Sequence, residues 1–409
     1  MHTDIDWLAS FDLRALPPGF HDDPYPFYRT LREADPVRQM PDGSIFLTCY
    51  ADCLQVYKDA SAFSSDKKAE FFPKYGDSPL FEHHTTSLVF NDPPLHTRVR
   101  KLMIGALSQR AVEAMEISLI QLVDRLLDEM DALSERGESI DLIEHFAAAI
   151  PVEVIGNLLG VPRDERAPLR DWSLAILGAL EPSLTNEQLT RGNRAVTEFV
   201  GYLKTLVARR RASPGDPATD VLTRLIQGES ASERLTETEL LQNCVFILNA
   251  GHETTTNLIG NALEMLTRWP SARDALIENP ALIKTAVEEF LRFESSNQLG
   301  NRMSTIETTI GGVRLPAQTR ITLCIGAANR DPAQFENPDT LDITREHNRH
   351  LAFGSGPHQC AGLAVARLEG AVAIGRFLSR FPSYEIDHAE KVRGGRARFR
   401  GFLKLPARL

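Results

Sequence analysis

The chain has 409 residues, of which 43% are hydrophobic and 24% are charged, and its formal net charge is −10. This is an ordinary globular composition, and the negative charge argues against general nucleic-acid binding, which needs a basic face. The N-terminus has no basic segment ahead of an apolar core, and no apolar run approaches the ~20 residues that cross a bilayer. Five cysteines at irregular spacing do not suggest a disulfide framework. We therefore expect a cytoplasmic monomer without a membrane or nucleic-acid partner.

Local patterns predict a small β region near the N-terminus. Residues Asp23–Ala34 begin with proline and become amphipathic, which predicts a helix. Val37–Thr48 is predicted to be a hairpin, because Pro41-Asp42-Gly43 supplies a turn between short apolar runs. Tyr50–Lys58 is expected to form a short helix. No long Ser/Gly or Pro linker follows anywhere in the chain, so we expect a single domain over residues 1–409.

The aromatic stretch Phe71–Phe90 contains Pro73, Gly76 and Pro79 and shows no sustained period. It is predicted to be a long irregular loop, which in a compact domain is often functional. The alternative is a poorly ordered surface loop. Its large apolar side chains favour the functional interpretation, since they would be poorly placed in water.

A helix is predicted to start within Asn91–Arg100. Asp92 is a suitable N-cap, and proline follows in the first turn. His96 and Arg100 are four residues apart and therefore share one helical face. Two hydrogen-bond donors on one face suit a carboxylate or a phosphate, although such a pair by itself is more often a solvated face.

From Arg110 to Gln227 the pattern is helical, with interruptions at glycine and proline. A long helix is then predicted from Thr236 to Trp269, because Thr236 and Glu239 form a capping box. In its middle lies Ala250-Gly251-His252-Glu253-Thr254-Thr255-Thr256, which is rich in poor helix formers. Positions 243, 247, 250 and 254 share a face, so Asn243, Ile247 and Ala250 should line one cavity with Thr254. The alternative is a plain buried helix with packed threonines.

The most informative stretch is Phe353–Gly362, in which one cysteine stands among glycines ahead of a long helical pattern. Glycines let the backbone turn tightly and approach a flat ligand. Orphan N–H groups and the dipole at a helix N-terminus favour an anion and lower the pKa of a thiol. A single cysteine cannot fill a tetrahedral zinc site, whereas a single thiolate can be the axial ligand of haem iron.

Phe353, Gly356, Cys360 and Gly362 fill the pattern Phe-x-x-Gly-x-x-x-Cys-x-Gly, which resembles the haem-binding signature of the cytochrome P450 monooxygenases, in their soluble bacterial form. Companion motifs follow in the family's order: Asp-Pro-Pro-x-His-x-x-x-Arg ending at Arg100, Ala-Gly-x-Glu-Thr ending at Thr254, and Glu-x-x-Arg at Glu289 and Arg292. The resemblance covers essentially the whole chain.

The resemblance implies a mainly α fold with a small β region, the triangular prism of the cytochrome P450 fold. Haem b would lie between the long central helix and the cysteine-led helix. The β-rich lobe is expected mainly in residues 35–60 and 295–327, with helices in the remainder.

The resemblance also assigns the site residues. Cys360 would ligate iron, with Phe353 and Gly362 beside the haem, and Thr254 and Glu253 would supply the alcohol and the acid that deliver protons to dioxygen. The propionates would be bound by His96, Arg100, Arg302 and His358. Glu289 and Arg292 would brace the cysteine loop, with Arg292 paired to the segment around Asp342–His347. The substrate pocket would be lined by Phe71, Phe72, Tyr75, Phe81, Leu88, Val89, Asn243, Ile247, Ala250, Ser295, Ser296, Asn297 and Phe399, under a roof of Trp172, Leu174, Ile176 and Leu177.

The implied reaction inserts one atom of O2 into a small-to-medium organic substrate by hydroxylation or oxidative O-demethylation, with aromatic compounds among the candidates. The polar stretch Ser295–Asn297 predicts a substrate with a hydrogen-bonding group, and the alternative is that backbone groups or water satisfy these side chains. NAD(P)H electrons would arrive through a ferredoxin and its reductase, docked near Arg98, Lys101 and Arg349. Two alternatives remain: a peroxide-driven haem-thiolate enzyme, and a non-enzymatic haem-binding sensor.

Overall fold

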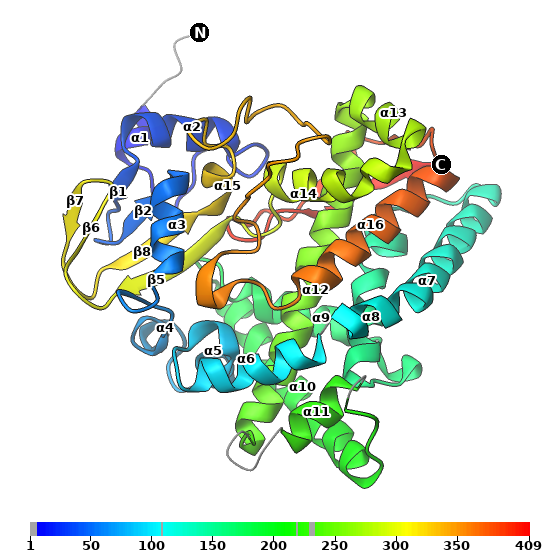
Figure 1. Cartoon of the computed structure of the whole chain (residues 1–409), viewed down its shortest axis with the longest axis horizontal. Helices are drawn as coiled ribbons and strands as arrows, with labels where there is room; N and C mark the ends of the chain where they lie inside the picture. Colours follow the sequence, from blue (N-terminus) through cyan, green and yellow to red (C-terminus); the bar gives the residue numbers. More distant parts are fainter. Residues whose placement is uncertain (1–5, 108, 218–219, 229–233) are drawn as a thin grey trace.

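A five-stranded sheet and its covering helices form one side of the molecule in the computed structural model, which describes residues 6–107, 109–217, 220–228 and 234–409 (Figure 1). The strand order is β1-β2-β8-β5-β3, and only the β2–β8 pair is parallel. The strands are β1 (Val37–Gln39), β2 (Ile45–Leu47), β3 (Phe63–Ser64), β5 (Leu299–Ser304) and β8 (Arg320–Cys324), and a separate hairpin is formed by β6 (Thr308–Ile310) and β7 (Val313–Leu315). The helices on this side are α1 (Asp6–Ala9), α2 (Tyr25–Ala34), α3 (Tyr50–Lys58) and α15 (Ile325–Ala328).

Helices make up the other side, so the predicted mainly α fold with a small β region is confirmed. They are α4 (Lys68–Tyr75), α5 (Pro79–Thr86), α6 (Leu95–Ala106), α7 (Gln109–Glu135), α8 (Ala149–Leu159), α9 (Leu169–Gly178), α10 (Asn186–Ala212), α11 (Val221–Gln227), α12 (Glu237–Arg268), α13 (Pro270–Glu278), α14 (Ile283–Phe293) and α16 (Leu363–Arg380). Short 3-10 or π turns lie at Leu88–Phe90, Ile143–Ala147, Arg163–Glu165, Pro280–Leu282 and Gly356–His358. Small ladders join β12 (Pro406–Arg408) to β4 (Ile140–Asp141) and to β9 (Glu385–Ile386), and β10 (Val392–Arg393) to β11 (Phe402–Lys404).

Helix α12 is the axis around which the other helices pack, and it runs through the middle of the view in Figure 1. Its 32 residues span ~48 Å. The predicted capping box is present: the Glu239 N–H donates to Thr236 Oγ1 (3.2 Å), and the Thr236 N–H donates to a Glu239 carboxylate oxygen (2.8 Å). The helix ends at Arg268 because Trp269 precedes Pro270 and takes a non-helical conformation.

Two local predictions are wrong. Phe71–Phe90 is not an irregular loop, because α4, α5 and a 3-10 turn occupy most of it. Ser78 caps α5 by accepting the Phe81 N–H, and Pro79 fits the first helical position. Asp92 is not the N-cap of α6: its carboxylate instead accepts the Ser64 hydroxyl and the Ser65 N–H (2.9 Å), and Pro94 precedes the first helical residue.

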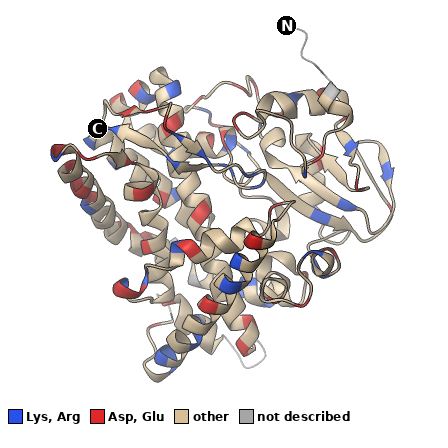
Figure 2. Ribbon diagram, turned by 180° about the vertical axis from the view of Figure 1, so that it is seen from behind, with Lys and Arg blue, Asp and Glu red and all other residues tan. Residues whose placement is uncertain are grey.

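Charged side chains are distributed along the outer helices, where Figure 2 shows acids and bases interspersed. Ion pairs join α7 and α16: Arg376 pairs with Asp124, and Arg380 pairs with Asp128 (2.9 Å). Such exposed pairs contribute little stability. Among the described residues, none of the helices combines the length and the apolar character needed to cross a bilayer.

Candidate active site

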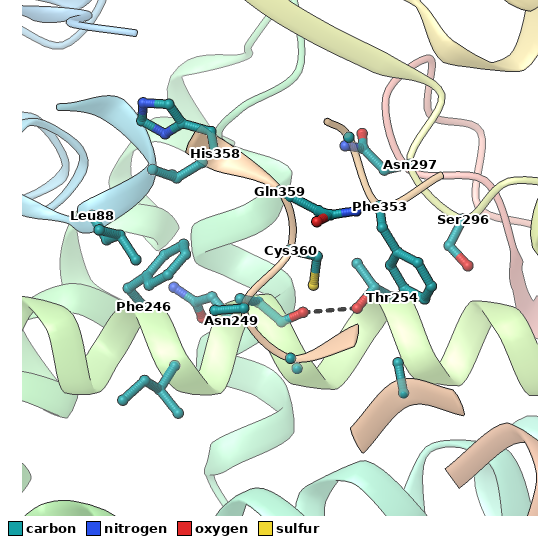
Figure 3. A pocket seen from close by; sticks show the side chains of 18 of the residues that line it. Leu88, Phe246, Asn249, Thr254, Ser296, Asn297, Phe353, His358, Gln359 and Cys360 are labelled. Carbon is teal, nitrogen blue, oxygen red and sulfur yellow. Dashed lines mark hydrogen bonds between the residues drawn. The ribbon is translucent and has the colours of Figure 1, made fainter. Parts of the chain in front are cut away.

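A cavity of about 340 Å³ lies between α12 and the Phe353–Gly362 loop. Its other walls come from α5 and the turn after it, from β5 and the segment preceding β5, and from the C-terminal turn at Phe399. Cys360 and Thr254 face each other across it (Figure 3). The cavity therefore brings together the motif in the middle of α12 and the cysteine motif, which are distant in sequence.

Cys360 lies just before α16, in a loop whose shape is set by glycine and a backbone hydrogen bond. The Cys360 N–H donates to the Phe353 carbonyl (2.8 Å). Gly356 has φ of +69°, and a Cβ there would stand 2.3 Å from the Tyr57 carbonyl oxygen, so only glycine fits. Although the cavity leaves Cys360 accessible, the protein packed behind it removes the thiol from bulk water.

The pKa of Cys360 differs from the prediction. Burial raises the pKa of the thiol, and the opposing effects of the Gly362 N–H, Arg100 and Arg367 do not cancel it. The expected net lowering by a helix N-terminus is therefore wrong for the protein without a bound group. The physical reason is position, because Cys360 precedes the N-cap, Gly362, by two residues.

The four predicted propionate ligands all line one part of this cavity. The rings of His96 and His358 lie with their centroids 3.9 Å apart. Burial lowers the pKa of His358 to about 3, helped by Arg302, His96 and Arg100. Arg302 donates to the Asn301 carbonyl (2.7 Å) and lies over the Tyr57 ring. This cluster is rich in donors and poor in acceptors.

The donor set fits a flat group with two carboxylates. His96 Nε2 is buried without a hydrogen-bond partner. Within the described part of the chain, neither Arg100 nor Arg302 has a carboxylate at ion-pair distance. On the other side of Cys360, a Cβ built on Gly362 would meet nothing within 4 Å, which leaves open space beside the sulfur. These residues could hold the haem that the sequence motifs imply.

Thr254 and Glu253 face different cavities. Thr254 lines the main cavity, and its hydroxyl donates to the Ala250 carbonyl (2.7 Å). Glu253 does not line it, because consecutive helical side chains point about 100° apart. It lies instead in a second cavity of about 30 Å³ on another side of α12, where Arg396 Nη1 donates to both carboxylate oxygens (2.6 and 2.8 Å). Burial raises the pKa of Glu253, and Arg396 opposes this shift. Helix α12 is continuous from Glu237 to Arg268, although its middle is rich in poor helix formers.

Glu369 is a buried acid of this cavity that sequence reasoning missed. It lies on α16, lines the cavity, and accepts a hydrogen bond from the Thr255 hydroxyl (3.3 Å). Burial raises the pKa of its carboxyl group to about 8, so it is largely protonated at neutral pH. The signal for it was an acid on the buried face of an amphipathic helix.

Some of the residues predicted for the substrate pocket line this cavity, and others do not. Seven of the predicted residues line the cavity: Leu88, Val89, Ile247, Ala250, Ser296, Asn297 and Phe399. The predicted roof contributes Leu177, whereas the cavity lining does not include Trp172, Leu174 or Ile176. Residues that were not predicted, notably His83, His84, Phe246, Asn249 and Arg398, complete the wall.

Six predicted pocket residues do not line the cavity: Phe71, Phe72, Tyr75, Phe81, Asn243 and Ser295. The aromatic residues pack in or around α4 and α5 because those segments are helices, and the Tyr75 hydroxyl donates to the Ala179 carbonyl (2.6 Å). Asn243 has a structural role, because its side-chain oxygen accepts a hydrogen bond from the Leu88 N–H (2.9 Å). Ser295 donates to the Leu291 carbonyl (2.8 Å).

Glu289 and Arg292 form a fully buried ion pair, 2.7 Å long, with neither side chain exposed. Arg292 donates to the carbonyls of Asn329 (2.9 Å), Pro338 (2.8 Å) and Thr340 (3.2 Å), and not to the segment around Asp342–His347 as expected. It is Glu289 that reaches this segment, by accepting from the Asp342 N–H (2.9 Å) and the Arg345 guanidinium (3.2 Å). The pair thus fastens α14 to the chain that leads into the cysteine loop.

Comparisons with known proteins give one family. The family model for cytochrome P450 matches residues 46–406. The chain is 37% identical to cytochrome P450 107B1 of Saccharopolyspora erythraea, over 97% of this chain and 98% of that protein. It is 35% identical to the biotin biosynthesis cytochrome P450 of Bacillus subtilis, over 90% and 91%.

A solved structure of P450BioI, in complex with an acyl carrier protein ligated to hexadec-9Z-enoic acid, superposes with a TM-score of 0.88 at 34% identity, over 95% of this chain and 98% of that one. The crystal structure of CalO2 gives a TM-score of 0.89 at 29% identity, over 97% and 98%. With a family model that spans most of its length and relatives matched nearly end to end, the chain belongs to the cytochrome P450 family of haem-thiolate monooxygenases.

Proposed function

We propose that this protein inserts one oxygen atom of O2 into a small-to-medium organic substrate, with Cys360 as the axial ligand of haem b. The observation that carries the proposal is the placement of the Cys360 sulfur opposite Thr254 in one cavity. When bound there, haem supplies reductive activation of dioxygen, with the second oxygen atom leaving as water. The cavity draws residues from both the sheet and the helices, which fits a single functional domain.

Different residues around the cavity bind the haem and deliver protons. His96, Arg100, Arg302 and His358 bind the propionates, which supply the acceptors that these donors lack. Phe353 and Gly362 flank the haem. Thr254 presents a hydroxyl where dioxygen is activated, and its bond to Ala250 fixes that hydroxyl.

Glu253 serves as the proton source from the small second cavity beside α12. It can reach the main cavity only by leaving Arg396, so we expect the ion pair to open during turnover.

The substrate is a largely apolar molecule with hydrogen-bonding groups. Ser296 Oγ and Asn297 Oδ1 are buried without partners and line the cavity, so a polar substrate group would satisfy them. Relatives of this chain include a vitamin D(3) 25-hydroxylase and a 6-deoxyerythronolide B hydroxylase, both named for hydroxylation. By analogy, hydroxylation is the reaction we propose first, with oxidative O-demethylation using the same residues.

Electrons come from NAD(P)H through a ferredoxin and its reductase, which dock on the cysteine side. Arg349, one of the basic residues proposed to contact an acidic partner, is exposed. Arg98, another of them, forms an ion pair with Glu239. Arg98 would have to exchange this partner on docking, so Arg349 is the stronger candidate.

Comparison of two electron sources tests the proposal. The purified haem protein should oxidise substrate with NADH, ferredoxin, reductase and O2, with about one NADH consumed per product molecule. Product formed from hydrogen peroxide alone, at a rate equal to or above that of the reduced system, would favour a peroxide-driven enzyme instead. A protein whose NADH consumption does not respond to any substrate would be a haem-binding sensor.

A further inference from the structure

One end of the cavity is built by a chain of hydrogen bonds that the catalytic assignment does not use. Gln242 Nε2 donates to the Glu82 carboxylate (3.3 Å), and His83 Nδ1 lies 3.1 Å from Gln242 Oε1. His83 Nε2 lies 3.4 Å from Asn249 Nδ2. The chain runs from exposed Glu82 on α5 to Asn249 on α12, and Gln242, His83 and Asn249 are each about 2% exposed.

The direction of each bond follows from Glu82. A carboxylate only accepts hydrogen bonds, so Gln242 must present its NH2 group to Glu82 and its oxygen to His83. His83 must then donate from Nδ1, and burial lowers its pKa to about 4, so its Nε2 carries no proton at neutral pH. Nε2 therefore accepts, and Asn249 must present Nδ2 to it. The chain of hydrogen bonds that begins at Glu82 therefore fixes the orientation of the Asn249 amide.

This orientation leaves the side-chain oxygen of Asn249 without a donor. Asn249 Oδ1 is buried and unpartnered, and Asn249 lines the cavity beside Leu88 and Phe246 (Figure 3). A second buried and unpartnered atom on the same cavity is His84 Nε2. Leaving a buried polar atom unsatisfied costs about 1–3 kcal/mol. A group that enters the cavity and donates a hydrogen bond to Asn249 would recover this cost.

The charges around this end select a neutral donor. Among the described residues of the lining, the one acid is Glu369, which is largely protonated at neutral pH. Burial holds the pKa of His84 well below its ordinary value, and His83, Lys74 and Arg398 act in the same direction. An ammonium group near His84 would meet the positive charges of Lys74 and Arg398, and a carboxylate has no proton to give to Asn249. A hydroxyl donates to Asn249 and is uncharged.

We infer that the end of the cavity between α5 and α12 is a substrate subsite for a hydroxyl group, with Asn249 Oδ1 as its acceptor. The inference rests on the proposed function and adds where the substrate's polar group lies. Asn249 precedes Thr254 by five positions on α12, which is ~7.5 Å along the helix axis. The subsite therefore places the carbon to be oxidised several bonds away from the hydroxyl, on the Thr254 side of the cavity.

Ligand pairs in which a methyl group replaces the hydroxyl hydrogen test the subsite on the haem-loaded protein. The probes are 4-hexylphenol with 4-hexylanisole, and dodecan-1-ol with 1-methoxydodecane; each ether can accept a hydrogen bond but cannot donate one. Dissociation constants come from the spin-state shift of the ferric haem. We expect each hydroxyl ligand to bind at least ~10-fold more tightly than its ether. Asn249→Leu should remove this preference mainly by weakening the hydroxyl ligand.

Two further variants separate the subsite from a general effect on the pocket. Asn257→Leu removes an asparagine of the same helix that borders the small second cavity and not the main one, and it should keep the hydroxyl preference. Gln242 does not belong to the cavity lining, and Gln242→Leu removes the hydrogen-bond acceptor of His83. This variant should therefore reduce the preference for the hydroxyl ligands without changing the binding of the ethers.

Several outcomes would overturn the inference. Equal binding of hydroxyl and ether ligands by the wild type, a preference that survives in Asn249→Leu, or no shift with any of the four probes would each do so. The thiolate spectrum of the reduced carbonyl complex, recorded on the same samples, shows separately whether the proposed function holds.

Discussion

Glu289→Ala should leave little haem-loaded protein and lower the free energy of unfolding by about 3–5 kcal/mol. The substitution strands the Arg292 guanidinium at a site where neither side chain of the pair is exposed. It also removes the acceptor for the Asp342 N–H and the Arg345 guanidinium, so the chain leading to Cys360 loses its attachment to α14. Haem content per protein and chemical unfolding measure the two effects.

A matched control for this variant is Glu129→Ala. Glu129 also belongs to a helical Glu–Arg pair, with Arg125, but its side chain is 61% exposed and that of Arg125 is 43% exposed. Exposed pairs of this kind contribute at most about 0.5 kcal/mol. Normal haem content and unchanged unfolding in Glu289→Ala, or an equal loss in both variants, would remove the structural role assigned to the buried pair.

Thr254→Ala should divert electrons from product to hydrogen peroxide. Without the hydroxyl, proton delivery at the site of oxygen activation loses its positioned group, and such groups are typically worth 10²–10⁴-fold. We expect product per NADH to fall at least ~10-fold while NADH consumption continues. Paired assays of product and peroxide measure the partition, and Thr254→Ser should restore much of the product.

Thr256→Ala is the control on the same helix. Its hydroxyl donates to the His252 carbonyl (3.0 Å), as that of Thr254 does to Ala250 (2.7 Å), but it borders the small cavity rather than the main one. Both variants lose a threonine and a bond to the preceding turn. Fully coupled turnover by Thr254→Ala, or the same uncoupling in Thr256→Ala, would refute the role of the Thr254 hydroxyl.

Elements with strong local signals were predictable from the sequence. Helix α12 has the predicted capping box and ends where proline requires, and the β1–β2 hairpin follows the predicted turn. The glycine at position 356 was informative because the backbone there approaches Tyr57 so closely that no side chain fits.

Features that depend on tertiary contacts were not predictable in this way. Asn243 shares a helical face with Ile247, but the Leu88 N–H, which is distant in sequence, holds its side chain outside the cavity lining. Asn249 gave no local signal, because its role depends on Gln242 and His83 meeting across two helices. Phe71–Phe90 has too many prolines and glycines to look helical, yet it forms two short helices capped at Ser78 and broken at Gly76.

The reduced carbonyl spectrum of the haem-loaded protein, compared between the wild type and Cys360→Ser, shows whether the sulfur of Cys360 binds the iron. We expect the wild type to show the red-shifted Soret band of a thiolate ligand and the variant to lose it. A variant that keeps the wild-type Soret band would show that the sulfur of Cys360 does not bind the iron.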